Sequence, residues 1–592
     1  MPQPRSQLKT FGGSPQKLSK QGFPLKRELI VVTKPEAEVR ARPEGVTSLS
    51  GVDTTGLATL LETESATMRP LFGISEERLK AEAATMPSAP GMIAPHLGLY
   101  YHVEAPDDKL DSLAEKLRTH NVVDAAYVKP AAELAFATAI ESMPELVHGI
   151  NEMQPLPQEA PLATPDFTGR QDYVGPAPTG IDARYAWTQA GGTGAGVRII
   201  DCEWNWNFGH EDLLQNQGGV VVGNAAGDDN HGTAVQGEIA GDRNTFGITG
   251  IAPDAMYSGA AFSLPTAQVI RGAADRLGEG DIILLEIHRA GPRYNFQGRA
   301  DQLGYIAVEW WPDDFDAIRY AINKGIVVVE AAGNGAENLD DSIYNTRPAG
   351  FPTTWTNPFN RNNRDSGAIV VGAGAPPPGT HGRNIWGPDR SRLDFSNYGA
   401  LIDAQGWGRE VTTTGYGDLQ GGSGKNQYYT DTFSGTSSAS PIVVGTLACA
   451  QGVLKANGRI PLSPVRARDV LRSTGSPQQD APGRPATQRI GNRPNLRQII
   501  PLILQKNNWI GVQFTGTLQP NQTQTWFTFM WPAHWHVLWS VVPITPKVGA
   551  PEIQSSVAVE RSEDRYITYW ITVTNLTNVP VNIEGRYAVL GW

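Results

Sequence analysis

The sequence predicts an α/β fold in which a parallel β-sheet carries helices on both faces. Short runs rich in Val and Ile alternate with longer helix-compatible stretches, as they do when helices join buried parallel strands. The clearest runs are 197–200, 282–285, 326–329 and 368–371. The flanking regions differ. A small α+β pattern comes before, and a strictly alternating run at 566–573, typical of an antiparallel sheet with one solvated face, comes after.

The composition is that of a folded protein with several domains. A length of 592 residues favours two to four domains, and 40% hydrophobic with 18% charged residues is typical of globular chains. The net charge of −11 argues against a nucleic-acid partner. No apolar run approaches the ~20 residues of a membrane-spanning helix, so we expect no membrane partner. The two cysteines, Cys202 and Cys449, exclude a disulfide framework and are expected to be separate buried thiols.

The N-terminal part divides into a tail and a compact domain. Residues 1–27 are basic and polar, and we expect them to be disordered. They lack the apolar stretch of ~7–15 residues of a secretory signal, so a cytoplasmic protein or a non-classical export route is expected. Residues 28–136 show the pattern of a small α+β domain. Strands are predicted at 28–33, 97–103 and 125–128. Two helices are also predicted: one has Leu57, Leu60 and Leu61 on one face, and the other is amphipathic, with Leu110, Leu113, Ala114 and Leu117 on its apolar face.

Shifts in composition predict the other boundaries. Residues 137–178 are rich in Pro and are expected to be a linker, 179–500 hold the parallel α/β domain, and 501–592 form a small antiparallel domain resembling a β-sandwich. This last region holds seven of the fifteen tryptophans. Aromatic side chains fill the cores of small sandwiches and also form binding surfaces, so both interpretations stay open. His534 and His536 share a strand face, but no third metal ligand accompanies them.

Four polar residues occur in an order that suggests acyl transfer. Asp201 lies near the end of a buried strand, His231 opens a helix-compatible run, Asn334 follows another strand, and Ser437 stands in F-S-G-T-S-S-A-S-P. Each alone has an ordinary structural explanation, such as a helix cap or a turn. Together they supply a nucleophile, a base, a carboxylate that orients the base, and an amide donor for an oxyanion.

The sequence around Ser437 supports this interpretation. The run from Ser437 to about Asn457, followed by Gly458, is apolar nearly all round and is predicted to be a helix crossing the core. Pro441 is tolerated only near its first turn. Ser437 is therefore expected at a helix N-terminus, where the dipole favours developing negative charge. The other serines of the stretch are expected to be small packing residues.

The order of the motifs separates two families of hydrolases. The α/β-hydrolases use G-x-S-x-G and place their histidine after the serine, which does not fit G-T-S-S-A. The blocks I-I-D-C-E, H-G-T-A-V and G-T-S-S-A-S-P, supported by G-H-E-D-L, G-I-A-P and D-F-S-N-Y-G, instead resemble the subtilisin-like serine proteases (subtilases) over roughly residues 180–500. A sedolisin-type acid protease shares the serine block, but H-G-T argues against it.

The resemblance implies a serine endopeptidase that acts on polypeptides, with no cofactor assigned and structural calcium possible. Ser437 would be the nucleophile, His231 the general base and acid, Asp201 the carboxylate that orients the imidazole, and Asn334 the oxyanion donor. It also implies that residues His288, Arg289 and Ala290 pair with an extended substrate, and that Ala331, Ala332 and Gly333 line the specificity pocket. A catalytically silent scaffold that binds peptides in the same cleft is the alternative.

The sequence departs from the family near the site. Cys202 and Glu203 stand where a small residue and glycine are usual, and Glu286 stands where asparagine is common. These carboxylates either favour basic substrates or are paired internally. The aromatic stretch W-N-W-N-F (204–208) lines a substrate site or packs structurally.

Two further expectations come from the resemblance. Many subtilases bind calcium, and oxygen ligands are available at Asp340, Asp341, Asn360 and Asp365, but no diagnostic spacing supports a site, so no metal is assigned. The domain at 28–136 resembles an inhibitory propeptide whose tail occupies the cleft, with self-cleavage near Phe136 or within 137–178. A permanent accessory domain is the alternative.

Overall fold

The computed structural model describes residues 25–85, 95–136 and 163–590, apart from residues 423, 506–508, 534, 546–548 and 564–565. Most of the predicted tail and linker, and His534, therefore lie outside the described residues. The chain forms two compact units, and the boundary between them falls at Ile503 and Leu504. The first unit contains both the N-terminal α+β elements and the parallel sheet.

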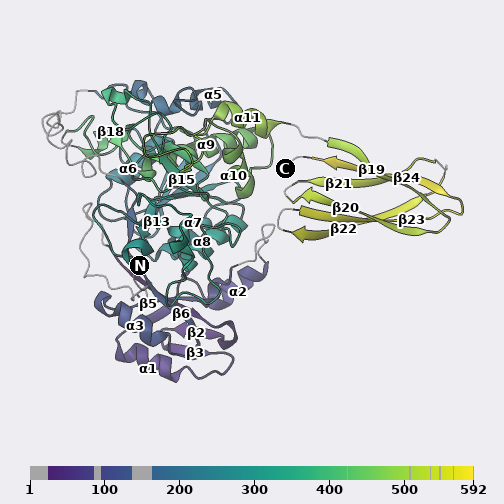
Figure 1. Cartoon of the computed structure of the whole chain (residues 1–592), viewed down its shortest axis with the longest axis horizontal. Helices are drawn as coiled ribbons and strands as arrows, with labels where there is room; N and C mark the ends of the chain where they lie inside the picture. Colours follow the sequence, from purple (N-terminus) through teal and green to yellow (C-terminus); the bar gives the residue numbers. More distant parts are fainter. Residues whose placement is uncertain are drawn as a thin grey trace, which may run out of the picture. The chain divides into compact units, whose positions relative to one another are not determined.

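The centre of the first unit is a seven-stranded parallel sheet, which confirms the predicted fold class (Figure 1). Its order is β16-β15-β14-β11-β8-β10-β9. The strands are β8 (Arg198–Glu203), β9 (Gln217–Val222), β10 (Met256–Ala261), β11 (Ile282–Leu285), β14 (Val327–Ala331), β15 (Ile369–Gly374) and β16 (Ala404–Trp407). The four predicted runs correspond to β8, β11, β14 and β15. They are continuous in Val and Ile because helices cover both faces of the sheet.

The helices pack on the sheet in pairs. Helix α6 (Asn230–Ala240) contacts α9 (Thr436–Ala456), and α7 (Thr266–Ala274) contacts α8 (Pro312–Asn323). In the described part of the chain, α9 is the one helix long and apolar enough to cross a membrane, and it is wholly buried in the protein core. The remaining helices are α5 (Ala183–Ala186), α10 (Pro464–Ser473) and α11 (Leu496–Leu504).

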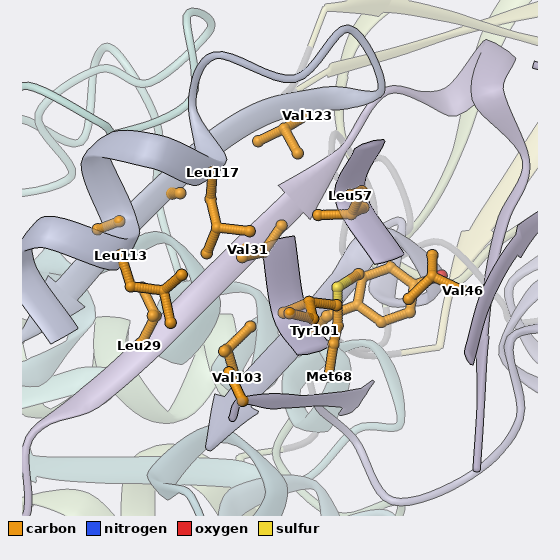
Figure 2. Packing of buried hydrophobic residues seen from close by; sticks show 14 of the residues in the cluster. Leu29, Val31, Val46, Leu57, Met68, Tyr101, Val103, Leu113, Leu117 and Val123 are labelled. Atoms are coloured by element: carbon orange, nitrogen blue, oxygen red, sulfur yellow. The ribbon is translucent and has the colours of Figure 1, made fainter. Parts of the chain in front are cut away.

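The N-terminal elements form an antiparallel sheet with helices on one face. The sheet order is β4-β5-β1-β6. Its strands are β1 (Glu28–Thr33), β4 (Thr67–Pro70), β5 (Tyr100–Glu104) and β6 (Val123–Lys129), accompanied by the hairpin β2 (Val39–Arg42) and β3 (Gly45–Ser48), and by α1 (Thr55–Thr63), α2 (Glu76–Thr85) and α3 (Leu110–Leu117). Figure 2 shows Leu29, Val31 and Tyr101 of the sheet packed with Leu57 of α1 and Leu117 of α3.

The opposite face of this sheet lies against the catalytic part of the first unit. Because side chains alternate along a strand, Tyr100 and Tyr127 point away from the core shown in Figure 2. The Tyr100 hydroxyl donates to Asp316 (2.7 Å) and the Tyr127 hydroxyl to Asp313 (2.9 Å), both on α8. Short strands then extend the contact into the cleft: β7 (Ala132–Leu134), β12 (Ile287–Ala290) and β13 (Tyr305–Ala307) form one sheet.

The second unit is a sandwich of two three-stranded antiparallel sheets (Figure 1). They are β19-β24-β21 and β20-β23-β22, with bounds β19 (Trp509–Leu518), β20 (Thr523–Pro532), β21 (Val537–Pro543), β22 (Ile553–Glu563), β23 (Tyr566–Asn575) and β24 (Val581–Val589). Trp526, Trp531 and Trp539 pack against its core, whereas Trp570 lies on the outer face with Phe527. The tryptophans therefore serve packing and surface roles together.

Candidate active site

The polar residues singled out in the sequence meet at the carboxyl edge of the parallel sheet, where sites of open α/β folds form. Strand β8 ends at Glu203, and Asn334 follows the end of β14. His231 and Ser437 lie in the first turns of α6 and α9. The side chains of Glu203, His231, Asn334 and Ser437 are all buried. Residues far apart in the chain thus share one small region.

The carboxylate on the histidine is Glu203, not Asp201. The His231 Nδ1 lies 2.9 Å from Glu203 Oε2. Asp201 lies two residues earlier inside β8, and its Oδ2 accepts hydrogen bonds from Trp206 Nε1 (2.9 Å) and the Tyr257 hydroxyl (2.7 Å). The prediction that Asp201 orients the imidazole is therefore wrong. The two carboxyl groups share one strand face, and Glu203 reaches the imidazole because β8 continues to that residue.

Asp201 and Glu203 form a carboxyl pair beneath the histidine. Asp201 Oδ1 and Glu203 Oε1 are buried, and no other described residue donates a hydrogen bond to either oxygen, so one proton shared between the two carboxyl groups satisfies both. Burial raises the pKa of both groups, and the contact between them raises the pKa of Asp201 while lowering that of Glu203. Since Asp201 Oδ2 already accepts two hydrogen bonds, its other oxygen is suited to carry the proton. Asp201 is then a neutral acid that donates to the Glu203 carboxylate.

Ser437 begins the buried helix as predicted from the sequence. The preceding Gly435 has φ of +106°, a conformation that favours glycine. Among the described residues, His231 Nε2 is buried and has no hydrogen-bond partner. No hydrogen bond therefore joins it to Ser437 in this state, and such bonds often tighten only during reaction. Burial lowers the pKa of His231 to about 4, so the imidazole is neutral at pH 7.

The Asn334 side chain is oriented by the residue before the serine. Its Oδ1 accepts hydrogen bonds from the backbone N–H (3.0 Å) and the hydroxyl (2.9 Å) of Thr436. The Nδ2 group therefore points the other way, where it donates to Gln302 (3.3 Å). The side chain is therefore held beside the turn that carries Ser437, and Nδ2 has a second N–H besides the one that Gln302 accepts.

A segment of the N-terminal region occupies the cleft. Strand β7 pairs antiparallel with β12, with Leu134 opposite Ile287 and Glu133 opposite His288. The next residue, Ala135, donates its N–H to the Glu286 carbonyl (3.4 Å) and accepts from the Ser437 N–H (3.2 Å) through its own carbonyl. The Ala135 carbonyl therefore lies at the N-terminus of α9, beside Ser437.

Comparison with known proteins shows the family of the chain. Residues 179–491 match the subtilase family. The chain belongs to the subtilase family. It is 28% identical over 350 residues to a calcium-dependent protease of Trichormus variabilis, covering 52% of this chain and 45% of that protein. It is also 28% identical to thermitase of Thermoactinomyces vulgaris, covering 50% of this chain and 85% of thermitase.

The chain thus spans less than half the length of the calcium-dependent protease. Among solved structures, fervidolysin from Fervidobacterium pennivorans matches with a TM-score of 0.45 at 14% identity, covering 94% of this chain and 69% of that one.

The predicted substrate strand of this subtilase is shifted by one residue. Residues 287–289 pair with β7, so His288 and Arg289 pair with an extended segment as predicted. Ala290 pairs with Tyr305 of β13 and not with β7, so the prediction for Ala290 is wrong for β7, the segment that occupies the cleft. The Arg289 side chain is buried and bound to Glu28 (2.9 Å). The Arg289 side chain therefore joins the N-terminal sheet to the catalytic part, while the Arg289 backbone pairs with β7 in the cleft.

The predicted pocket residues lie opposite this strand. Ala331 ends β14, and Ala332 and Gly333 follow it. Gly333 has φ of +96°, and a Cβ there would lie 2.8 Å from Asn397 Nδ2 and 3.4 Å from His288 Nδ1. Glycine is thus required, and the His288 ring reaches across from β12 to this turn.

The departures from the family pattern have internal explanations. Glu286 is buried, and its Oε1 lies 2.6 Å from the Ser440 hydroxyl, which also lies 2.7 Å from the Thr436 carbonyl. One hydroxyl proton serves only one of these acceptors, so a protonated Glu286 satisfies both contacts. Burial also raises the pKa of Glu286. Trp206 is buried beneath the histidine helix rather than lining a substrate surface.

The acidic residues considered for calcium have other partners. Asp341 binds Arg293 (2.8 Å), Asp365 binds Arg468 (2.7 Å), and Asp340 accepts from the Ala400 N–H (3.0 Å). They do not form one ligand set. Within the described ranges, no group of three or more His, Cys, Asp or Glu residues is arranged to hold a metal ion. Both cysteines are buried and unpaired.

Proposed function

We propose that this subtilase is a serine endopeptidase with a Glu203–His231–Ser437 triad, synthesised with its own inhibitory domain. The observation that carries the proposal is the Ala135 carbonyl, which accepts from the Ser437 N–H beside a buried, neutral His231. A peptide bond, a nucleophile and a base therefore meet in one site. A silent peptide-binding scaffold would not require the imidazole to be fixed by a buried carboxylate.

The proposed reaction follows the general chemistry of serine triads. His231 Nε2 accepts the Ser437 proton as Oγ attacks the carbonyl carbon, and Glu203 stabilises the imidazolium that forms. The Ser437 N–H and Asn334 Nδ2 donate to the oxyanion. The imidazolium then protonates the leaving amine, and water hydrolyses the acyl-enzyme by the same route. Polypeptides are the substrates, and every step uses side chains of this chain.

The N-terminal domain is proposed to be the first substrate and then an inhibitor. The bond proposed for cleavage is Ala135–Phe136, because the Ala135 carbonyl accepts from the Ser437 N–H. After cleavage, the β7 pairing would hold residues 132–134 in the cleft as a product-like strand. Two relatives carry calcium dependence in their names. Asp340, Asp341 and Asp365 are bound to other parts of the protein and do not fit such a site.

Intact mass and a fluorophosphonate probe test the proposal on the wild type and Ser437→Ala. The wild type should yield fragments ending at Ala135 and starting at Phe136 and should be labelled at Ser437. The Ser437→Ala variant should remain full length and unlabelled. A wild type that stays full length and unlabelled would refute the protease assignment. Labelling without cleavage would refute self-processing alone.

A further inference from the structure

We infer that the cleft selects residues on both sides of the scissile bond, with a small residue before it and an aromatic residue after it. This inference rests on the proposed endopeptidase function and on Ala135–Phe136 as the bond at the nucleophile. It names the substrate class: polypeptides containing Ala-Phe or similar pairs in an extended segment. Two independent features of the cleft carry it.

The first feature is an aromatic clamp around Phe136. The Phe136 ring stacks on Tyr416, with centroids 5.3 Å apart and an interplanar angle of 12°. It also stacks on Phe433 at 6.0 Å and 20°, and meets His231 edge-on at 6.1 Å. Stacked and edge-to-face pairs at these distances are the favourable arrangements of aromatic rings. A single ring after the scissile bond thus contacts three rings of the catalytic domain.

The clamp is built into the segments that carry the catalytic groups. Tyr416 has φ of +59°, which is unusual for a bulky residue, and its N–H donates to Asn230 Oδ1 (2.8 Å), directly before His231. Phe433 ends β18 (Tyr429–Phe433), two residues before Gly435. Strained backbone that the surrounding structure holds in place is a feature of binding sites. The position of the tyrosine ring is therefore coupled to the histidine helix.

The second feature is the restricted space before the scissile bond. Ala135 is wholly buried. The two segments that flank its site, β12 and the turn at Gly333, are bridged by His288, whose Nδ1 accepts the Asn334 N–H (3.2 Å). The His288 ring also packs on Tyr305, with centroids 4.7 Å apart. Because Ala135 has no exposed surface, a larger side chain at this position would have to displace residues that already fill the site.

Together these features predict a defined order of peptide cleavage. Burial of an aromatic ring against other rings is expected to raise kcat/KM by about 10- to 100-fold over alanine at the same position. A Phe before the bond should lower kcat/KM by at least about 10-fold, because overpacking a tight site is unfavourable. The pair Ala-Phe should therefore be cleaved fastest, Ala-Ala next, and Phe-Ala slowest.

Quenched fluorescent peptides copying residues 131–138, with the central pair Ala-Phe, Ala-Ala or Phe-Ala, test this inference on the self-processed enzyme. Each kcat/KM ratio is measured within one preparation, so a loss of active protein cancels. Tyr416→Asn suits the left-handed backbone and removes the ring. It should reduce the Ala-Phe over Ala-Ala ratio by about 10-fold. His288→Gly should raise the rate on Phe-Ala relative to Ala-Ala.

The outcomes separate the two proposals. Equal cleavage of Ala-Phe and Ala-Ala by an enzyme that the fluorophosphonate probe labels would overturn the inference and leave the protease assignment intact. An unchanged ratio in Tyr416→Asn would overturn the clamp. No cleavage of any peptide, together with no labelling, would overturn the proposed function and the inference with it.

Discussion

Two buried groups of carboxyl residues in the first unit have similar composition but differ in the number of cations that they contact. The catalytic cluster consists of Asp201, Glu203 and Glu286, and it faces one imidazole. Burial raises the pKa of all three carboxyl groups. Charge is therefore disfavoured in this cluster, and Glu203, which contacts both Asp201 and His231, is the one group assigned as a carboxylate.

The docking cluster lies where the N-terminal sheet meets α8. Its carboxyl groups are Glu28, Asp313 and Asp314, and they surround Lys129 Nζ at 3.1, 2.5 and 2.9 Å respectively. Arg289 binds Glu28 from the other side. Burial opposes ionisation of Glu28, but Lys129 and Arg289 outweigh it and hold its pKa well below the ordinary value. For Asp314 burial outweighs the same two cations and raises its pKa to about 7.

The comparison shows that the supply of cations, rather than burial alone, decides the ionisation of a buried carboxyl group. The docking cluster has two cations for three carboxyl groups, and the catalytic cluster has a histidine whose own pKa is lowered by burial. The docking cluster stabilises the contact between the N-terminal sheet and α8 through charge. The catalytic cluster orients the base His231 through hydrogen bonds. Each prediction below perturbs one cluster in a way that should leave the other intact.

The largest effect is expected from Glu203→Gln. Loss of the carboxylate on His231 should lower kcat by about 10³- to 10⁴-fold, by analogy with amide substitution in serine triads. Asp201→Asn should cost less than about 10-fold, because the amide can still donate to Glu203 and accept from Trp206 and Tyr257. Peptide kinetics on the two variants, normalised to folded protein, check this. The reverse order would make Asp201 the orienting carboxylate.

A smaller but substantial effect is expected from Lys129→Met. Removing the central cation leaves three buried carboxyl groups to one arginine, which should lower the free energy of unfolding by about 3–5 kcal/mol. Urea unfolding of the uncleaved Ser437→Ala chain measures it. Arg69→Gln is the matched control, because Arg69 pairs with Glu104 on the exposed surface. Equal midpoints for both variants would contradict the role assigned to the docking cluster.

The smallest effect concerns pH. His231 acts as a base only when neutral, so self-cleavage should be lost as pH falls through its pKa, which burial lowers to about 4. At pH 5 the rate should stay near its neutral value, whereas an imidazole with the ordinary pKa of about 6.5 would give a roughly 30-fold loss. Mass spectrometry of the precursor refolded at several pH values follows the rate. A midpoint near 6.5 would show that the Glu203 carboxylate offsets the effect of burial on the histidine.

The sequence by itself determined the elements whose signal is local. The Val and Ile runs predicted β8, β11, β14 and β15, and the apolar pattern after Ser437 predicted α9, because buried strands and core helices need such side chains. Ordered motifs also identified His231, Asn334 and Ser437, the residues that the fold brings together.

Only the tertiary structure decided which carboxylate contacts the histidine. Asp201 and Glu203 are two residues apart in β8, so they point to the same face of the strand and differ only in their position along it. The tertiary structure likewise decided the pairing register of β12, which depends on where β7 docks rather than on the residues of β12. The protonation of buried carboxyl groups follows from the cations and donors that distant segments bring to them, and that information is nowhere local in the chain.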